Sequence, residues 1–389
     1  MATSQPASQR VDSQPASQRA MSTNGLDGGP RGTSGSEIMS ALGSSRKQRI
    51  FFFTGDDKEI GSHAVKDIMG DAQSVDSVVA WSQCREMLLT SADKRQSVLV
   101  MDTERGVTKS ELSLRRERKN WNMTVDSIAP MQKWEQYNRS DEIHLYGLGD
   151  NGRTVFHLHH DSRIRDNVEE HVIAADSCRK YKSYIFTSQA QTKAGFLALG
   201  RSDGAIALYD YVMKSENASC VLDGQPGPVN AVDVSADGRW LVWTTPDFVF
   251  FTVLEQTHWS KGKKEKPRIM RLDISDADQA KFGLAAVNLS AEEEEDDLTV
   301  NWLPARFDAG TADLMAADTV EREIISYVKD VQVRWPLKQL LKAYDAEEAT
   351  YFGLAKSVTD NGSVAFHRPV LGDVDLVALS GEIVKTLKF

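Results

Sequence analysis

The stretch Gly195–Glu255 decides the fold, and it reads GFLALGRSDGAIALYDYVMKSENASCVLDGQPGPVNAVDVSADGRWLVWTTPDFVFFTVLE. Apolar residues alternate on both sides of Ser202–Gly204, and an Asp-Gly pair between two alternating segments is a strong hairpin signal. The pattern returns around a second turn, Ser235–Gly238, which is followed by Trp240–Trp243 and Phe248–Val253. The stretch therefore predicts two successive groups of antiparallel strands.

This order of elements is typical of WD-repeat-like β-propeller blades, in which a strand ends in a small-residue hairpin and the second strand ends in an aromatic-Asp pair, here Tyr209-Asp210. The same spacing occurs earlier, where Asp150–Gly152 separates Ile143–Gly147 from Thr154–Leu158. We therefore predict an all-β fold, a single closed β-propeller with seven four-stranded blades. Pairing between the Ile50 segment and the last strands is the expected closure, because it would leave no unpaired edge.

One helix is expected within this strand pattern. Leu337, Leu340, Leu341 and Tyr344 follow helical spacing directly after Trp335-Pro336. Such spacing predicts a short amphipathic helix between two strands.

The chain divides into two parts by composition. Residues 1–48 repeat SQPASQR, are rich in Gly, Ser and Pro, and contain none of the 31 aromatic residues. Such a segment cannot offset its chain entropy by burial, so we predict a disordered tail. Residues 49–389 hold every aromatic residue and are predicted to form the propeller domain.

Charge and cysteine content limit the class of protein. The formal net charge is −10, and the first 48 residues carry five Lys/Arg and three Asp/Glu, which leaves −12 on the remainder. An acidic body argues against nucleic-acid binding. Three scattered cysteines (Cys84, Cys178 and Cys220) fit neither a disulfide framework nor a CxxC metal site. Without an apolar run of about 18 residues or a signal peptide, we expect a soluble, monomeric protein of the cytoplasm, with the nucleus left open.

Histidines are concentrated in the segment FHLHHD. Alternation places His157 and His159 on one face of a strand with Asp161 nearby, where two imidazoles could bind a metal. A polar strand of a propeller explains the same run without metal, and we predict no metal and no other cofactor. Asp150, Asp203, Asp237 and Asp360 are interpreted as turn residues, because Asp bonds its own turn backbone.

A basic stretch is the candidate partner-binding site. Five basic residues fall within eight positions of the predicted loop Trp259–Arg268, namely Lys261, Lys263, Lys264, Lys266 and Arg268. A solvated loop tip is the plainer interpretation, and contact with an acidic partner, a phosphate or a lipid headgroup is the sharper one. No nucleophile elbow, Walker loop, HExxH helix or dinucleotide fingerprint occurs, so no catalytic residue is predicted.

The segments ALGRSDGAIALYD and GPVNAVDVSADGRWLVWTT closely resemble the C-terminal domain of the vacuolar import and degradation protein twenty-seven family. The resemblance continues in PRIMRLDI, EREIISYVKDVQVRWPLKQL and DVDLVALSGEIV, and more loosely in VLVMDTERG and RIFFFTGDDKEIG, so that it spans residues 49–389. It implies a propeller that acts as a non-catalytic scaffold for other proteins, with a link to vacuolar import and degradation. The alternative is a hydrolase or lactonase-like enzyme that uses the central channel.

Overall fold

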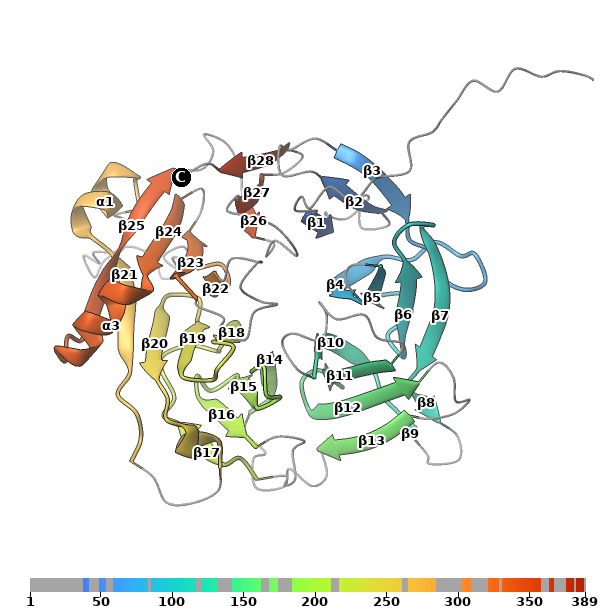
Figure 1. Ribbon diagram of the computed structural model, residues 1–389, viewed down its shortest axis with the longest axis horizontal. Coiled ribbons are helices and arrows are strands. Elements are labelled where there is room, and N and C mark those ends of the chain that lie inside the picture. The colour runs from blue at the N-terminus through green and yellow to red at the C-terminus, as the bar shows by residue number, and fades with distance from the viewer. Residues whose placement is uncertain are drawn as a thin grey trace, which may run out of the picture. The chain divides into compact units, whose positions relative to one another are not determined.

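The computed structural model consists mainly of β-strands (Figure 1). All the residues that it describes belong to one compact unit, residues 35–389. The predicted all-β fold is confirmed, whereas the acidic run Glu292–Asp297 and the turn at Asp360 lie outside the described residues. The described ranges are 38–41, 49–53, 59–82, 85–116, 121–131, 142–161, 168–173, 184–210, 217–260, 265–284, 302–308, 321–328, 331–357, 364–366, 376–380 and 383–387.

Three groups of four antiparallel strands follow one another, each paired in the order of the sequence. The first strands of neighbouring groups lie against one another, β4 against β10, β10 against β14, and β14 against β18 of the next sheet. This is the arrangement of the inner strands of propeller blades. The bounds are β4 (Val75–Trp81), β5 (Glu86–Ser91), β6 (Ser97–Asp102), β7 (Val107–Ser113); β10 (Val125–Pro130), β11 (Glu142–Gly149), β12 (Thr154–Asp161), β13 (Val168–Ile173); and β14 (Phe186–Gln191), β15 (Leu197–Arg201), β16 (Ile206–Tyr209), β17 (Cys220–Leu222).

The next eight strands form one continuous sheet. Its two halves are antiparallel four-stranded groups that are joined by a parallel pair between their outermost strands, β21 and β25. The pair runs from Arg271 opposite Thr350 to Ile274 opposite Gly353. In order across the sheet the strands are β18 (Ala231–Val234), β19 (Trp240–Thr244), β20 (Val249–Val253), β21 (Met270–Ile274), β25 (Thr350–Ser357), β24 (Val331–Pro336), β23 (Glu323–Val328) and β22 (Arg306–Asp308).

The predicted helix is present as α3 (Leu337–Asp345), directly after β24. Leu337 and Leu340 are buried, and Tyr344 meets the Phe251 ring edge-on, so the apolar face packs on the eight-stranded sheet. Two shorter helical segments, η5 (Gln256–Trp259) and α1 (Asp276–Lys281), flank β21. Among the described residues, no helix combines the length and apolar composition that a membrane span requires.

Smaller sheets are formed near both ends of the chain and between β7 and β10. They are β1 (Ile38–Ala41), β2 (Arg49–Phe53) and β3 (Glu59–Ala64); β26 (Val364–Phe366), β27 (Leu376–Ser380) and β28 (Ile383–Leu387); and the two-stranded pair β8 (Arg115–Arg116) and β9 (Trp121–Asn122). The predicted pairing of the Ile50 segment with the last strands is wrong, because β1 and β3 occupy both edges of β2. The blade count and the closure therefore stay predictions.

Tight turns connect the strands where the sequence predicts them. Asp150 and Asn151 have φ of 54° and 57°, which completes the left-handed turn between β11 and β12 together with Gly152. A Cβ on Gly152 would lie 2.0 Å from the carbonyl oxygen of Phe186 at the start of β14, so only glycine fits there. The turn role of Asp237 is also confirmed, since its Oδ1 accepts the Arg239 N–H at 3.0 Å.

The hydrophobic core lies between successive strand groups. Phe156 and Trp81 belong to one cluster shared by the β4–β7 and β10–β13 groups, whereas Trp243 belongs to a cluster shared by β14–β17 and the start of the eight-stranded sheet. Trp335 is fully buried in the cluster of the eight-stranded sheet, with its ring centroid 5.7 Å from that of Trp302. Each large apolar side chain contributes about 1.5–3 kcal/mol on burial, which makes these junctions the main source of stability.

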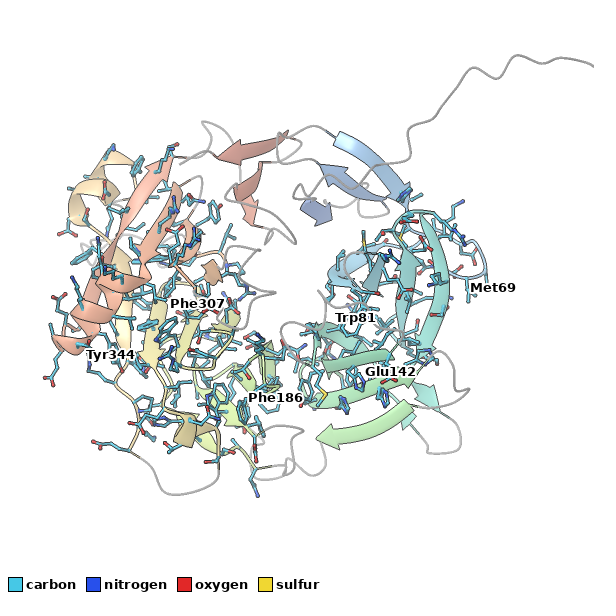
Figure 2. The ribbon with its side chains drawn as sticks, viewed as in Figure 1. Met69, Trp81, Glu142, Phe186, Phe307 and Tyr344 are labelled. Carbon is cyan, nitrogen blue, oxygen red and sulfur yellow. The ribbon has the colours of Figure 1, made fainter. Side chains whose placement is uncertain are left out.

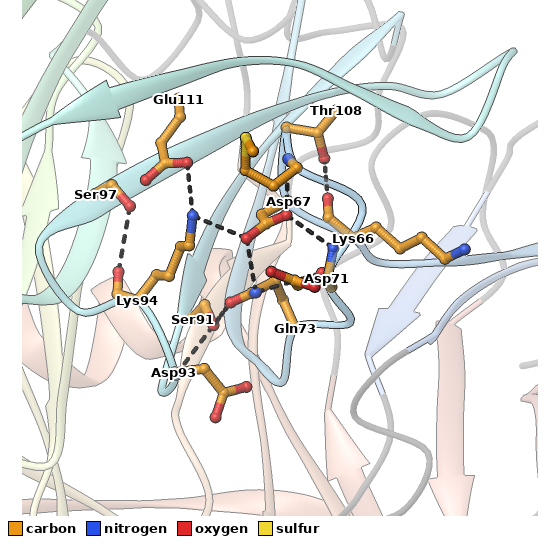
Figure 3. A network of polar contacts seen from close by, with 11 residues as sticks. Lys66, Asp67, Asp71, Gln73, Ser91, Asp93, Lys94, Ser97, Thr108 and Glu111 are labelled. Carbon is orange, nitrogen blue, oxygen red and sulfur yellow. Dashed lines mark hydrogen bonds and ion pairs between the residues drawn. The ribbon is translucent and has the colours of Figure 1, made fainter.

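A polar network secures the loop that precedes β4 (Figure 3). The buried carboxylate of Asp67 accepts the backbone N–H groups of Met69 and Asp71, each at 2.9 Å, and pairs with Lys94 Nζ at 2.8 Å. Lys94 also pairs with Glu111 of β7 at 3.0 Å. The Lys94 ammonium lowers the pKa of Asp67, although burial of the carboxylate acts in the opposite direction. The network thus ties the loop to β7 through charged groups.

Candidate functional site

The loop between β20 and β21 holds the basic residues predicted to bind a partner. At its start, Trp259 is fully buried, donates from Nε1 to the Gly238 carbonyl at 2.9 Å and stacks on Phe196 with 5.6 Å between ring centroids. His258 lies beside it, with Nε2 3.0 Å from the Glu265 carbonyl oxygen. The loop is therefore anchored where it leaves the sheet. Three of its basic residues lie outside the described residues, namely Lys261, Lys263 and Lys264.

Arg268 anchors the other end of the loop. Its guanidinium donates to the carbonyl oxygens of Tyr344 and Glu348, and it lies 4.2 Å from the centre of the ring of Tyr344, which is labelled in Figure 2. Tyr344 lies in the last turn of α3 and Glu348 three residues beyond the end of the helix, where the helix dipole favours a cation. Arg268 thus holds α3 against the start of β21. Its role in partner binding stays a prediction.

Lys266 points to solvent and pairs with Asp223, which follows β17. The two side chains are 54% and 70% exposed, so solvent screens the pair and it contributes little to stability. Lys266 therefore fits the interpretation of a solvated loop tip, whereas Arg268 does not.

A second polar cluster occupies one face of β11 and β12. Antiparallel pairing sets Glu142 opposite Asp161, His144 opposite His159, and Tyr146 opposite His157. Because side chains two residues apart share a face, these three rungs lie on the same side of the sheet. The predicted placement of His157 and His159 on one face is confirmed. The sequence paired them with Asp161, whereas the structure adds Glu142 and His144 from the neighbouring strand.

Glu142, His144 and His159 bring three ligand-type atoms together (Figure 2, where Glu142 is labelled). Glu142 Oε2 lies 3.3 Å from His144 Nε2 and 3.6 Å from His159 Nε2. The two imidazole rings stack with 4.0 Å between centroids and 13° between planes. Burial lowers the pKa of His144, the neighbouring His159 ring lowers it further, and Glu142 acts in the opposite direction. A lowered pKa favours the neutral imidazole.

His157 belongs to the same face but is more deeply buried. Its side chain is 8% exposed, and its ring centroid lies 5.6 Å from that of Tyr146 and 6.3 Å from that of His144. Of the two histidines that the sequence placed on one face, His159 thus belongs to the group with Glu142 and His144, and His157 lies beside that group.

Glu142 and His144 escaped the sequence analysis, although a signal for them exists. The turn at Asp150–Gly152 fixes the register of the hairpin, because Gly149 pairs with Thr154 and each step outward adds one residue on both strands. Counting outward from that pair reaches His144 opposite His159. Reading the histidines of β12 across the hairpin, and not only along it, would have found both residues.

The packing of successive four-stranded groups on one another, with their first strands adjacent, defines the chain as a WD40-like β-propeller. The family described as the VID27 C-terminal WD40-like domain matches residues 46–353. The chain therefore belongs to the Vid27 family, which confirms the resemblance seen in the sequence.

Two curated relatives carry the name Vacuolar import and degradation protein 27. The protein from Saccharomyces cerevisiae is 28% identical over 207 residues, which cover 51% of this chain and 24% of the relative. The protein from Schizosaccharomyces pombe is 22% identical over 276 residues, which cover 68% of this chain and 30% of the relative. The chain thus spans less than a third of the length of either relative.

Solved structures support the fold alone. The β-propeller domain of Cps50 (Swd1) from Myceliophteria thermophila aligns with a TM-score of 0.55 at 10% identity, covering 88% of this chain and 92% of that chain. A chain of the Mitotic Checkpoint Complex aligns with a TM-score of 0.51 at 14% identity, covering 91% of this chain and 84% of that chain.

Proposed function

We propose that this protein is a non-catalytic scaffold of the cytoplasm that binds other proteins through its propeller, and that some of its partners act in the import of proteins into the vacuole or in their degradation there. The family and the WD40-like fold support a role in protein interaction. The name of the two yeast relatives supports the link to the vacuole. We further propose that residues 49–389 form the interaction domain and residues 1–48 a tail, of which the short strand β1 (Ile38–Ala41) pairs with β2.

The anchored basic loop is the observation that carries the proposal for a binding surface. Trp259 and Arg268 fix the two ends of the loop to the core and to α3, and the four lysines lie between these anchors. A rigid scaffold that holds out a variable loop is a common way to build a binding site. A cluster of cations on a body of negative net charge would attract an acidic protein partner and make its association salt dependent.

The test reverses the charge of the loop and leaves its anchors in place. A variant with Lys261, Lys263, Lys264 and Lys266 changed to Glu should melt like the parent protein, because individual exposed charges contribute about 1 kcal/mol or less. In affinity purification followed by mass spectrometry, we expect acidic partners to be depleted severalfold at low and at physiological salt. Arg268 is retained, because its loss would disturb α3.

A matched control carries the same total change of charge at dispersed positions. It replaces four exposed basic residues with Glu, namely Lys66, Arg95, Arg105 and Lys338. The control should recover the parent's partners. Equal recovery by the loop variant would show that the loop is a solvated tip, and equal loss in both variants would show that only net charge matters.

A further inference from the structure

We propose that Glu142, His144 and His159 form a binding site for a divalent transition-metal ion of the zinc class, contrary to the expectation from the sequence that no metal binds. Two imidazoles and one carboxylate are a ligand set that zinc accepts in proteins. Within the described ranges, these residues are the one group of three or more His, Cys, Asp or Glu side chains whose ligand atoms lie within 4.8 Å of one another.

Two of the three separations between ligand atoms fit one small cation. With bonds of about 2.0–2.1 Å at a tetrahedral angle, neighbouring ligand atoms lie about 3.3–3.4 Å apart. The two distances from Glu142 Oε2 to the imidazole Nε2 atoms are 3.3 and 3.6 Å. Both nitrogens thus approach the same carboxylate oxygen at close to the separation that a shared metal ion requires.

The position in the sheet pre-organises the group. His144 and His159 form one cross-strand rung, and Glu142 is two residues from His144 on the same strand and face. The backbone of a regular hairpin therefore holds all three residues in place. Sites built on strands are more rigid than sites built on loops.

The three residues are partly exposed, although the His159 Nε2 atom itself is buried. The side chains of His144, His159 and Glu142 are 29%, 20% and 38% exposed. Three protein ligands leave one tetrahedral position for water or for a side chain of another molecule. Because the side chains are partly exposed, addition of metal to the folded chain tests the proposal.

The experiment uses the full chain, purified without a histidine tag, stripped with a chelator and titrated with Zn²⁺ alone. We expect about one equivalent to bind and to raise the melting temperature, because a ligand that binds only the folded state stabilises it. Titration with Co²⁺ provides a second signal, the visible absorption of the ligated ion. Changing one ligand should weaken binding more than about tenfold, since even loss of an outer-shell partner costs 10–100-fold.

The variants are Glu142→Gln, His144→Ala and His159→Ala, and the matched control is His160→Ala on the opposite face of β12. Only the first three should lose binding and the metal-dependent rise in melting temperature. Glu142→Gln keeps the volume of the side chain and remains informative if a histidine variant does not fold. The proposal is overturned if the parent does not bind Zn²⁺, or if Glu142→Gln binds it as tightly as the parent does.

Discussion

In the β4–β7 group the outermost strand has one strand neighbour, whereas β21, the corresponding strand of the eight-stranded sheet, has a strand on each side. Side chains tie β7 to the loop that precedes β4. Lys94 bridges Asp67 of that loop and Glu111 of β7, and the Thr108 hydroxyl of β7 donates to the Lys66 carbonyl. β21 is tied to β25 by backbone hydrogen bonds and to α3 by Arg268.

The attachments of β21 and β7 should differ in their sensitivity to pH and salt. Backbone hydrogen bonds between strands involve no titratable group, so the β21–β25 pair should be insensitive to mild changes of pH and salt. An ion-pair network depends on the charge of each member, and salt weakens the exposed ones. The attachment of β21 should therefore tolerate acid, whereas the attachment of β7 through ion pairs should weaken in acid.

The largest effect should come from removing core side chains in the two regions. Trp335→Ala empties the core of the eight-stranded sheet and Phe156→Ala empties the core beside β4–β7, and each should cost about 3–5 kcal/mol of unfolding free energy. Denaturant unfolding followed by tryptophan fluorescence and by circular dichroism measures this. Because successive groups share their cores, we expect one transition in both variants, with both probes coincident.

Two separate transitions, with Trp335→Ala moving only one of them, would contradict this expectation. The two regions would then be independent folding units, and the proposal of one interaction domain over residues 49–389 would fail.

Arg268→Ala should have an intermediate effect, confined to the eight-stranded sheet. It removes two hydrogen bonds to the end of α3 and the contact with the Tyr344 ring, for which we expect a loss of about 1–2 kcal/mol. Arg268→Lys should restore part of it, because an ammonium keeps the charge but lacks the planar fork. Lys266→Ala, two residues away, is the control and should change stability by less than about 0.5 kcal/mol. If Lys266→Ala lost as much unfolding free energy as Arg268→Ala, Arg268 would have no special role in holding α3.

The smallest expected effect is the loss of stability on acidification, which should affect the Asp67 network and not the β21–β25 pair. The pKa of Asp67 is lowered in the fold from its ordinary value of 3.8, so the carboxylate contributes stability above about that pH and loses it as the pH falls toward the folded-state pKa. Asp67→Asn keeps the side-chain shape and removes the charge that faces Lys94. We expect the variant to be less stable than the parent at neutral pH and to approach it on acidification.

Melting temperatures recorded from pH 6 down to about pH 3 test this, with the exposed Asp76→Asn as control. Parallel curves for the parent and Asp67→Asn over the whole range would show that the Lys94 bridge does not stabilise the fold.

The strand order of the fold was predictable from short-range patterns. The Asp-Gly turns predicted the hairpins, because Asp, Asn and Gly are the residues that favour the left-handed conformation of a tight turn. The spacing from Leu337 predicted α3. The pairing of β21 with β25 was not predictable, because it joins residues about eighty positions apart and depends on how two neighbouring sheets meet. The predicted pairing of the Ile50 segment with the last strands was wrong for a related reason, since nothing local to β2 indicates that β1 and β3 occupy its edges.

The candidate sites divide in the same way. The basic cluster was visible as composition, but composition does not distinguish Lys266, which points to solvent, from Arg268, which binds the end of α3. That distinction requires knowing that residue 268 lies beside residue 344. The histidine cluster was half visible, because alternation along β12 revealed one strand and the contribution of β11 required the register across the hairpin.

The parallel pairing of β21 with β25 also decides where an extended peptide could join this molecule by strand addition. A peptide that adds to a sheet needs a row of backbone N–H and C=O groups without a strand partner. Within the eight-stranded sheet, β21 and β25 each have a strand on both sides, so a peptide finds no free edge at either of them. By contrast β7, β13 and β17, the last strands of the three four-stranded groups, each have one strand neighbour, and we expect β-augmentation by a partner at outer edges of that kind.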